Sequence, residues 1–337
     1  MREGLHISLR ELSTVDRVGP VMLTCDLDAL PLTLEPDRRG TIADLVERIA
    51  EERAELSRKL LGPGALLLRG WRMENLADFM SVVRAFAGER PLFGYAGGAS
   101  PRSALGDGSY SSTDYPPHVA LSLHNELSYT AVHPRLLFFA CLQAPEAGGE
   151  TTLGDSRRIL HAIEPQAAAR FKQRHVRYLR NLSPFGGAGY SWQEAFETED
   201  PVEAEARARA MGASVEWQAG GWLRLSQVRP ATATHPETGE EVWFNQADGF
   251  HPSALDPVSY AQALAFAGSE ESFRLGVTYG DGGEIAAGDL EEVRAAVRNE
   301  TRPHRWREGD VLVIDNLLVA HGRRPFSGPR KIVLAMV

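Results

Sequence analysis

The chain contains 337 residues, 43% of them hydrophobic and 24% charged, and its formal net charge is −9. A chain so rich in core-forming residues is not disordered, and its acidic balance argues against a nucleic-acid partner or a polybasic membrane surface. Residues 1–30 lack the apolar region of a signal sequence, and the apolar stretches are far shorter than the roughly 20 residues that span a bilayer. We therefore expect a cytoplasmic globular protein without a membrane partner, and composition alone does not define its oligomeric state.

The first part of the chain alternates helices with a short strand. Apolar residues at helical spacing predict a helix over residues 41–61, which Gly62-Pro63-Gly64 ends. The run Ala65–Leu68 predicts a short strand. A second helix follows, and Asn75 is its expected N-cap.

Beyond about residue 90 the pattern changes to short strands separated by turns. Strands are expected at 120–129, 135–142, 175–182, 214–217, 224–234, 241–245, 311–315 and 331–336. Helices are expected at 155–171, 191–211 and 287–299. This pattern predicts a mainly β fold with flanking helices, a double-stranded β-helix or jelly roll, rather than a parallel α/β sheet. The chain has no dinucleotide-binding glycine motif and no Walker A motif.

A histidine and a carboxylate stand two residues apart in the segment Leu121–Tyr129. Side chains two apart on a strand face the same side, so His124 and Glu126 can present an imidazole and a carboxylate to one point. Taken alone, this pair is equally consistent with a surface ion pair.

A second segment supplies a further histidine. The apolar strand 311–315 leads to His321, which begins a polar loop. His124, Glu126 and His321 together form the two-histidine, one-carboxylate set that holds one face of an Fe(II) ion and leaves three positions open. Open positions are what a metal needs to bind a chelating cosubstrate and O₂ together. A zinc hydrolase with the same three ligands remains an alternative.

A chelating dicarboxylate also needs a partner for its far carboxylate, and arginine is suited to bidentate carboxylate recognition. Arg330 stands beyond His321 at the start of the last strand, and Thr151 offers a hydroxyl after two glycines. Lys331 competes with Arg330, because a one-residue change in loop length exchanges them. We favour Arg330 because its planar fork fits a carboxylate.

These motifs together resemble the taurine dioxygenase and clavaminate synthase-like superfamily (TauD/TfdA) of Fe(II)/2-oxoglutarate oxygenases. The resemblance runs from about residue 64 to the C-terminus, and residues 1–60 match loosely. Three short motifs carry it: the strand Leu66–Gly70, the pair His124-x-Glu126 and the turn Gly148-Gly149-Glu150-Thr151. Two further features are the Trp306-x-x-Gly309-Asp310 motif before the strand that ends in Asp315-Asn316, and His321 followed by an arginine.

The resemblance implies Fe(II), 2-oxoglutarate and O₂ as cofactors, with iron on His124, Glu126 and His321. It implies that Arg330 and Thr151 hold the far carboxylate of 2-oxoglutarate, and that turnover releases succinate. Because Glu126 supplies the carboxylate ligand that family halogenases lack, hydroxylation or desaturation is favoured over halogenation.

The expected architecture is a single oxygenase domain, 1–337, with an inserted lid and substrate region at about 182–225. Loops 97–117 and 182–200 are the expected lid, which must exclude water from the reaction.

Segments 97–102, 112–117 and 124–129 resemble syringomycin-type amino-acid hydroxylases. Such bacterial enzymes often act in natural-product pathways, some of them on amino acids tethered to a carrier protein. This branch implies a free, carrier-bound or peptide-like amino-acid-derived substrate. Desaturation, epimerisation and cyclisation at the same iron site remain alternatives. Leu334 stands where taurine-type members carry a sulfonate-reading arginine, which argues against a sulfonate substrate.

The polar candidates for reading this substrate are mixed in charge, as a zwitterion requires: Arg102, Asn125, Asp114, Gln246 and Asp281. Asn125 and Arg102 rank first, because Asn125 lies between two ligand candidates and Arg102 follows a glycine-rich loop. On a regular strand, however, Asn125 points to the face opposite His124 and Glu126 unless a bulge turns it.

Overall fold

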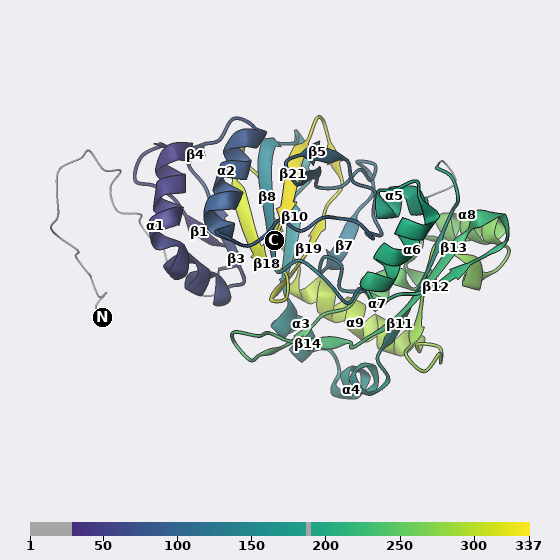
Figure 1. Cartoon of the computed structure of the whole chain (residues 1–337). Helices are drawn as coiled ribbons and strands as arrows, with labels where there is room; N and C mark the ends of the chain where they lie inside the picture. Colours follow the sequence, from purple (N-terminus) through teal and green to yellow (C-terminus); the bar gives the residue numbers. More distant parts are fainter. Residues whose placement is uncertain (1–28, 187–189) are drawn as a thin grey trace.

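The computed structural model describes residues 29–186 and 190–337 of the chain. Two β-sheets pack face to face at its centre, and their shared apolar core takes residues from both, among them Leu123, Phe139 and Val319. Helices cover the outside of this pair of sheets (Figure 1). Within the described residues, no helix is both long and apolar enough to cross a membrane.

The larger sheet has the strand order β1-β3-β18-β8-β21-β6-β5. Its strands are β1 (Leu32–Leu34), β3 (Ala65–Leu68), β18 (Val311–Asp315), β8 (Leu136–Gln143), β21 (Lys331–Met336), β6 (Ser109–Ser111) and β5 (Ala104–Gly106). The central strands are apolar on both faces, because the facing sheet covers one face and helices cover the other.

The smaller sheet has the order β17-β10-β19-β7 and is antiparallel. Its strands are β17 (Arg302–His304), β10 (Thr151–Asp155), β19 (Val319–Arg323) and β7 (Leu121–His124). The pairing of β19 with β7 places His321 directly opposite His124. His124 and His321 are thus 197 positions apart in the chain, yet strand pairing makes them neighbours in the sheet.

Two helices cover the outer face of the larger sheet. They are α1 (Ile42–Leu61) and α2 (Leu76–Ala87), and Figure 1 shows them side by side at one end of the molecule. Thr41 caps α1 with a capping box, and Asn75 caps α2 through its side chain. The predicted helix over 41–61 and the predicted N-cap Asn75 are thus confirmed.

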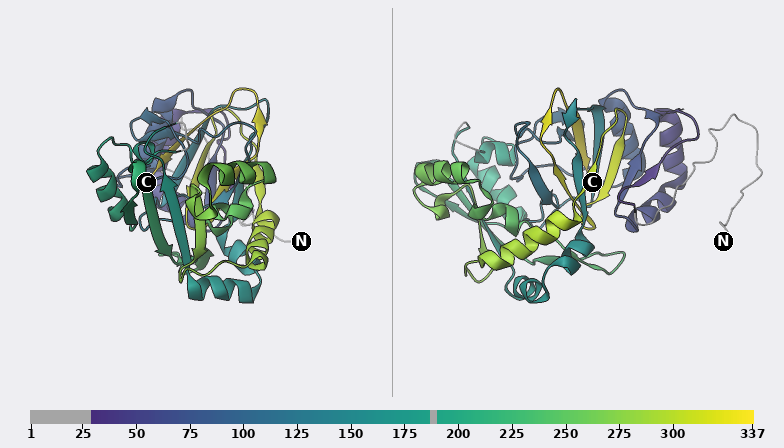
Figure 2. Two further views of the ribbon diagram at one scale, coloured as in Figure 1. Left: turned by 90° about the vertical axis from the view of Figure 1, so that its right-hand side faces the viewer. Right: turned by 180° about the vertical axis from the view of Figure 1, so that it is seen from behind.

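A third sheet lies at the end of the molecule opposite α1 (Figures 1 and 2). Its order is β12-β13-β11-β16, and its strands are β12 (Ser214–Trp217), β13 (Leu223–Arg229), β11 (Val176–Leu182) and β16 (Leu275–Tyr279). The helices of this region are α5 (Trp192–Phe196), α6 (Pro201–Ala210), α7 (Ala247–Phe250) and α8 (Pro257–Ala267). A separate apolar cluster joins α5 and α6 to this sheet.

The remaining elements connect these layers. They are α3 (Ser156–Ala162), α4 (Pro165–Arg174), α9 (Ala287–Glu300), β2 (Gly40–Thr41), β4 (Trp71–Arg72), β9 (Ala147–Gly148), β14 (Thr232–Thr234), β15 (Glu241–Trp243), β20 (Phe326–Ser327), and the 3₁₀ turns η1 (Ala219–Gly221), η2 (Pro252–Ala254) and η3 (Glu270–Ser272).

The strand predicted over 120–129 ends at His124, because residues 126–129 form a turn in which Leu127 has a φ of 56°. Prolines explain three other boundaries that differ from expectation. The helix predicted over 155–171 is two helices, because Pro165 begins α4, and Pro201 likewise begins α6 within the predicted helix 191–211. The strand predicted over 224–234 is interrupted at Pro230, between β13 and β14. Helix α8 and strand β16 were not predicted.

Candidate metal and cosubstrate site

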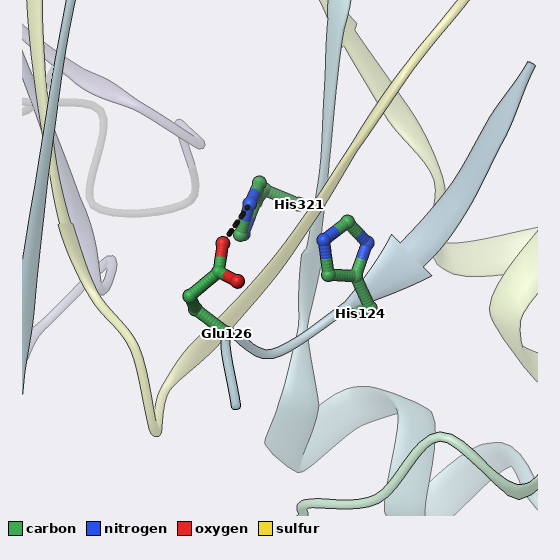
Figure 3. A group of neighbouring side chains, drawn as sticks. All are labelled: His124, Glu126 and His321. Carbon is green, nitrogen blue, oxygen red and sulfur yellow. Dashed lines mark ion pairs between the residues drawn. The ribbon is translucent and has the colours of Figure 1, made fainter. Parts of the chain in front are cut away.

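Three side chains that are distant in the sequence meet at the end of β7 and on β19 (Figure 3). One potential ligand atom from each of His124, Glu126 and His321 lies within 4.8 Å of the others. The two imidazole centroids are 4.4 Å apart, and His321 Nε2 lies 3.6 Å from Glu126 Oε2. Strand pairing fixes both histidines, so the arrangement follows from the sheet.

The protonation states of this cluster suit a bound cation. His124 Nδ1 lies 2.9 Å from the Ser122 carbonyl oxygen, which can only accept, so Nδ1 carries the proton and Nε2 is free for a metal. Burial, with the neighbouring His321 ring, lowers the pKa of His124 to about 4, so the ring is neutral near pH 7. Burial also opposes ionisation of Glu126, but the Arg102 guanidinium and the two neighbouring histidines together outweigh it and lower that pKa to about 2.

Asn316 holds the main chain of Glu126 in place. Its amide group donates to the Glu126 carbonyl oxygen at 2.9 Å and accepts from the Glu126 backbone N–H at 2.7 Å. The same amide donates to the Pro134 carbonyl oxygen at 2.9 Å. A fully buried side chain with all these groups satisfied fixes the backbone at the carboxylate.

Asn125 does not reach the cavity. Its amide group donates to the Asn316 carbonyl oxygen at 2.7 Å and to Ser156 Oγ at 3.2 Å, and the side chain is buried. The predicted substrate contact by Asn125 gains no support from this geometry: the residue follows the end of β7 at His124, and its amide is used by Ser156 and Asn316. Asn125 supports the ligand loop instead.

Arg102 faces the carboxylate of the cluster. Its Nη2 donates to Glu126 Oε2 at 2.6 Å, and the two side chains are only 3% and 4% exposed. The guanidinium lies over the Tyr95 ring, and Nη1 donates to the Ser112 carbonyl oxygen. Arg102 therefore lines the cavity, as predicted, but its charge is already matched by Glu126.

The two histidines form part of the wall of a cavity of about 670 Å³. Besides β7 and β19, the wall takes residues from segments 99–123 and 246–275. Residues of the predicted lid 97–117 are among them, whereas none of the described residues between 182 and 225 is. The predicted substrate role of 182–225 gains no support from this wall, and the lid role of 97–117 stays a prediction.

One end of the cavity carries Arg330 and Thr151. Arg330 Nε donates to the Gly149 carbonyl oxygen at 3.2 Å and Nη1 to Ser112 Oγ at 3.3 Å, and no carboxylate among the described residues pairs with it. Burial, together with the nearby Arg323, lowers the pKa of Arg330 to about 10. Thr151 Oγ1 accepts from Trp306 Nε1 at 3.0 Å, and Lys331 is exposed, outside the cavity wall.

These observations fit an iron ion with a chelating dicarboxylate. His321 Nδ1 is buried with no hydrogen-bond partner in the described part of the chain, and the buried Glu126 carboxylate lies 3.6 Å from Nε2 of the same ring. A guanidinium without a counterion lies at the neighbouring end of the cavity, where a far carboxylate would relieve its desolvation.

Of the other three residues predicted to contact the substrate, one lines the cavity and two lie outside it. Gln246 lines the cavity, and its amide nitrogen donates to the Asn125 carbonyl oxygen and to Ser128 Oγ. Asp114 is exposed and accepts from Ser103 and Ser111 hydroxyls, outside the cavity wall. Asp281 is exposed and pairs with Arg174 at 2.7 Å. A substrate contact by Asp114 or Asp281 therefore gains no support from this geometry, because serine hydroxyls already use the Asp114 carboxylate and Arg174 that of Asp281.

Sequence reasoning missed several residues of this site. Asn316 was noted only within a motif, and its clamp on Glu126 depends on a contact between distant segments. Asp248 and Arg274 line the cavity and were not proposed. Their segments, α7 and the start of β16, carry no motif that separates them from ordinary surface residues.

Comparison with known proteins adds independent information. The family model described as taurine catabolism dioxygenase TauD, TfdA family, matches residues 27–336. The chain is 36% identical over 274 residues to the dapdiamide synthesis protein DdaC of Enterobacter agglomerans, covering 81% of this chain and 82% of that protein. It is 30% identical over 285 residues to a clavaminate synthase-like protein of Arabidopsis thaliana, covering 81% of each.

Among solved structures, the chain resembles PvcB, described as an Fe, alpha-ketoglutarate dependent oxygenase from an isonitrile synthetic pathway. The TM-score is 0.50 at 16% identity, over 98% of this chain and 94% of that one. This likeness shows the fold and confirms the predicted jelly roll. The family match begins at residue 27, so it extends the resemblance seen in the sequence to include α1.

Proposed function

Because this chain belongs to the TauD/TfdA family of dioxygenases, we propose that it hydroxylates a small amino-acid-derived molecule in a natural-product pathway. As a family member it is a 2-oxoglutarate-dependent non-haem iron dioxygenase, with Fe(II), 2-oxoglutarate and O₂ as cofactors. Its substrate is a small molecule. The zinc-hydrolase alternative is thereby set aside.

The observation that carries the proposal is the cluster of His124, Glu126 and His321, whose two histidines line a large cavity. In this proposal the three side chains hold iron on one face, and Arg330 with Thr151 receives the far carboxylate of 2-oxoglutarate. Bound iron and 2-oxoglutarate supply, with O₂, the oxidising chemistry for an unactivated C–H bond.

The chain's own residues position and protect that chemistry. Asn316 keeps Glu126 aimed at the histidines, and Arg102 keeps it ionised. Phe139 packs against the His321 ring at 5.1 Å between centroids, so an apolar wall borders the ligands and excludes water from them. Arg330 gives the cosubstrate a single orientation, because its fork binds one carboxylate in a plane.

Two features support the reaction and the substrate class. Glu126 occupies the carboxylate position of the iron site, which favours hydroxylation over halogenation. DdaC is named for the synthesis of dapdiamide, and PvcB for an isonitrile pathway, so similar proteins act in the assembly of specialised nitrogen-containing products. The proposed substrate is therefore an amino acid, free, carrier-bound or peptide-like.

Succinate release tests this proposal. The iron-loaded enzyme is incubated with 2-oxoglutarate and a panel of free and carrier-bound amino acids, with His321→Ala as the inactive control. We expect succinate to form with one class of amino-acid-derived compound, whose product gains one oxygen atom. A product that loses two hydrogen atoms would indicate desaturation instead. Succinate formed with taurine and with no amino-acid-derived compound would overturn the proposal.

A further inference from the structure

The cavity holds two charged side chains that the iron and 2-oxoglutarate sites leave unused, Arg274 and Asp248. We propose that Arg274 binds the carboxylate and Asp248 the ammonium group of the substrate. The substrate is then a free amino acid rather than one tethered through its carboxyl group. This inference rests on the proposed function and narrows it.

The arginines of the cavity wall divide by what they already bind. Arg102 is paired with Glu126. Arg323 donates to the carbonyl oxygens of Tyr115, Pro116 and Val119 at 2.8–3.1 Å, so its guanidinium holds a loop. Arg323, Arg330 and Arg274 all lack a carboxylate partner among residues 29–186 and 190–337, but Arg330 and Arg274 each make only two hydrogen bonds and keep donors to spare. The proposed 2-oxoglutarate site uses only Arg330.

Arg274 is held in position with donors to spare. It precedes β16, and its Nη1 donates to the Ala99 carbonyl oxygen at 2.7 Å while Nη2 donates to the Tyr115 hydroxyl at 3.1 Å. A guanidinium has five N–H donors, so three remain after these two bonds. A cation fixed at a cavity wall without a counterion is preorganised for an anion.

Asp248 is the complementary group. It lies on α7, is only 8% exposed, and forms no ion pair with any described residue. Arg294 is nearby, but its Nη2 donates to the backbone carbonyl oxygen of Asp248 and to Ser253 Oγ, not to the carboxylate. A buried carboxylate without a cation is destabilising, and a bound ammonium group would remove that cost.

Both groups belong to the part of the wall formed by residues 246–275, where α7 packs against β16. Gln246 stands on the same wall with both amide N–H donors engaged, which leaves its oxygen as a further acceptor for an ammonium group. His124, one of the proposed iron ligands, lines the same cavity as Asp248.

This arrangement of Arg274 and Asp248 distinguishes a free amino acid from one tethered to a carrier protein. An amino acid attached to a carrier protein through its carboxyl group presents a neutral thioester where a free one presents a carboxylate. A neutral thioester carbonyl can accept a hydrogen bond from Arg274 but leaves its positive charge without a counterion, whereas a carboxylate supplies one. The cavity wall therefore favours the zwitterion.

Calorimetric binding with matched ligands tests this. The enzyme is loaded with Mn(II) and 2-oxoglutarate, and the tightest binder is chosen from a panel of free L-amino acids. Its carboxamide lacks the carboxylate, and its N-acetyl derivative lacks the ammonium group. Because charge-assisted hydrogen bonds are strong, we expect each derivative to bind wild type at least about tenfold more weakly. Arg274→Gln should weaken binding of the free amino acid by about tenfold and leave the affinity for the carboxamide unchanged. Asp248→Asn should weaken binding of the free amino acid and leave the affinity for the N-acetyl derivative unchanged.

Three further variants control for indirect effects. Arg298→Gln and Glu291→Gln make the same charge changes in an exposed ion pair on α9 and should leave binding unchanged. Tyr115→Phe removes one contact of Arg274 with its charge intact and should keep the preference for the free carboxylate.

The outcomes separate the two proposals. If wild type binds no free amino acid and forms no succinate with any amino-acid-derived compound, both fall. If wild type binds the carboxamide as tightly as the free acid, or Arg274→Gln weakens both equally, only this inference falls, and a carrier-bound substrate is then favoured.

Discussion

The cavity has two contrasting walls. The wall that carries His124 and His321 belongs to paired strands of the central sheets, and its supporting polar groups, such as the Asn316 amide, are buried and fully bonded. The wall formed by residues 246–275 consists of short helices and turns, and none of the residues of α8 is buried. In the proposed function, the two histidine ligands thus rest on strand pairing, whereas substrate recognition rests on segments whose side chains can change without disturbing the core.

Replacing the proposed iron ligands should have the largest effect on activity, because it removes metal-binding groups from the strand-paired wall. We expect His124→Ala, Glu126→Ala and His321→Ala each to abolish Fe(II)-dependent turnover, by more than the roughly 10–100-fold that outer partners of metal ligands contribute. Iron stoichiometry and succinate release measure this, with circular dichroism as the check on folding. Full activity with native iron content in any one variant would refute the ligand assignment.

The cosubstrate end should respond next most strongly. Arg330→Leu removes a half-buried guanidinium from the cavity wall, and we expect the 2-oxoglutarate KM to rise roughly tenfold or more, since a charge-assisted pair contributes about 1.5–3 kcal/mol. Lys331→Leu changes an exposed side chain and serves as the matched control, with little change in KM. If Lys331→Leu has the larger effect, the anchor is Lys331.

The contrast between the walls also explains what could be predicted from the sequence. His124, Glu126 and His321 were identifiable because the chemistry of a metal site restricts residue type and spacing at once. The jelly roll was identifiable because alternating strands and turns repeat along most of the chain. Helix α8 escaped prediction because its exposed apolar residues, such as Val258 and Phe266, form no amphipathic pattern.

The substrate residues were harder for a different reason. Asp114 and Asp281 are charged residues in promising loops, yet each is used by a local turn or ion pair that composition does not show. Asp248 and Arg274 stand out only because the fold leaves their charges unpaired in one cavity. Whether a charge has a partner is a property of tertiary structure, so sequence alone could not separate these pairs.

Asn316 tests how firmly the strand-paired wall depends on its buried bonds. Asn316→Ala leaves the Glu126 N–H and carbonyl oxygen without partners, and we expect the free energy of unfolding to fall by about 2–4 kcal/mol, since each buried unpaired group costs about 1–3. Denaturant unfolding measures this. Asp281→Ala, in an exposed ion pair, is the comparison and should shift the midpoint far less. Equal shifts would mean that the Asn316 clamp is not a stabilising feature.

Acid should also act on the sheet side of the molecule. Burial lowers the pKa of His304, on β17, to about 4, well below the usual value near 6.5. Between pH 6.5 and about pH 4, His304 therefore binds a proton in the unfolded chain but not in the folded chain. The free energy of unfolding consequently falls as the pH falls through this window. We expect the loss attributable to His304 to be up to about 3 kcal/mol.

His304→Gln is the variant that isolates this contribution. Its free energy of unfolding should depend less steeply on pH between 6.5 and 4 than that of wild type. Some slope should persist, because burial lowers the pKa of His133 to about 4 as well. Identical slopes for the variant and wild type would contradict the assignment of this window to His304.

The smallest effect is expected on α8, where the second wall is least buried. Phe266 is 65% exposed, so Phe266→Ala should change the free energy of unfolding by no more than about 0.5 kcal/mol. Phe138 on β8 is fully buried, and Phe138→Ala should cost about 3–5 kcal/mol. Hydrogen exchange should agree, with α8 amides exchanging through local opening and β8 amides only through global unfolding. If α8 amides were as protected as those of β8, the two walls would share one cooperative unit, and substitutions on the recognition wall would then destabilise the metal site as well.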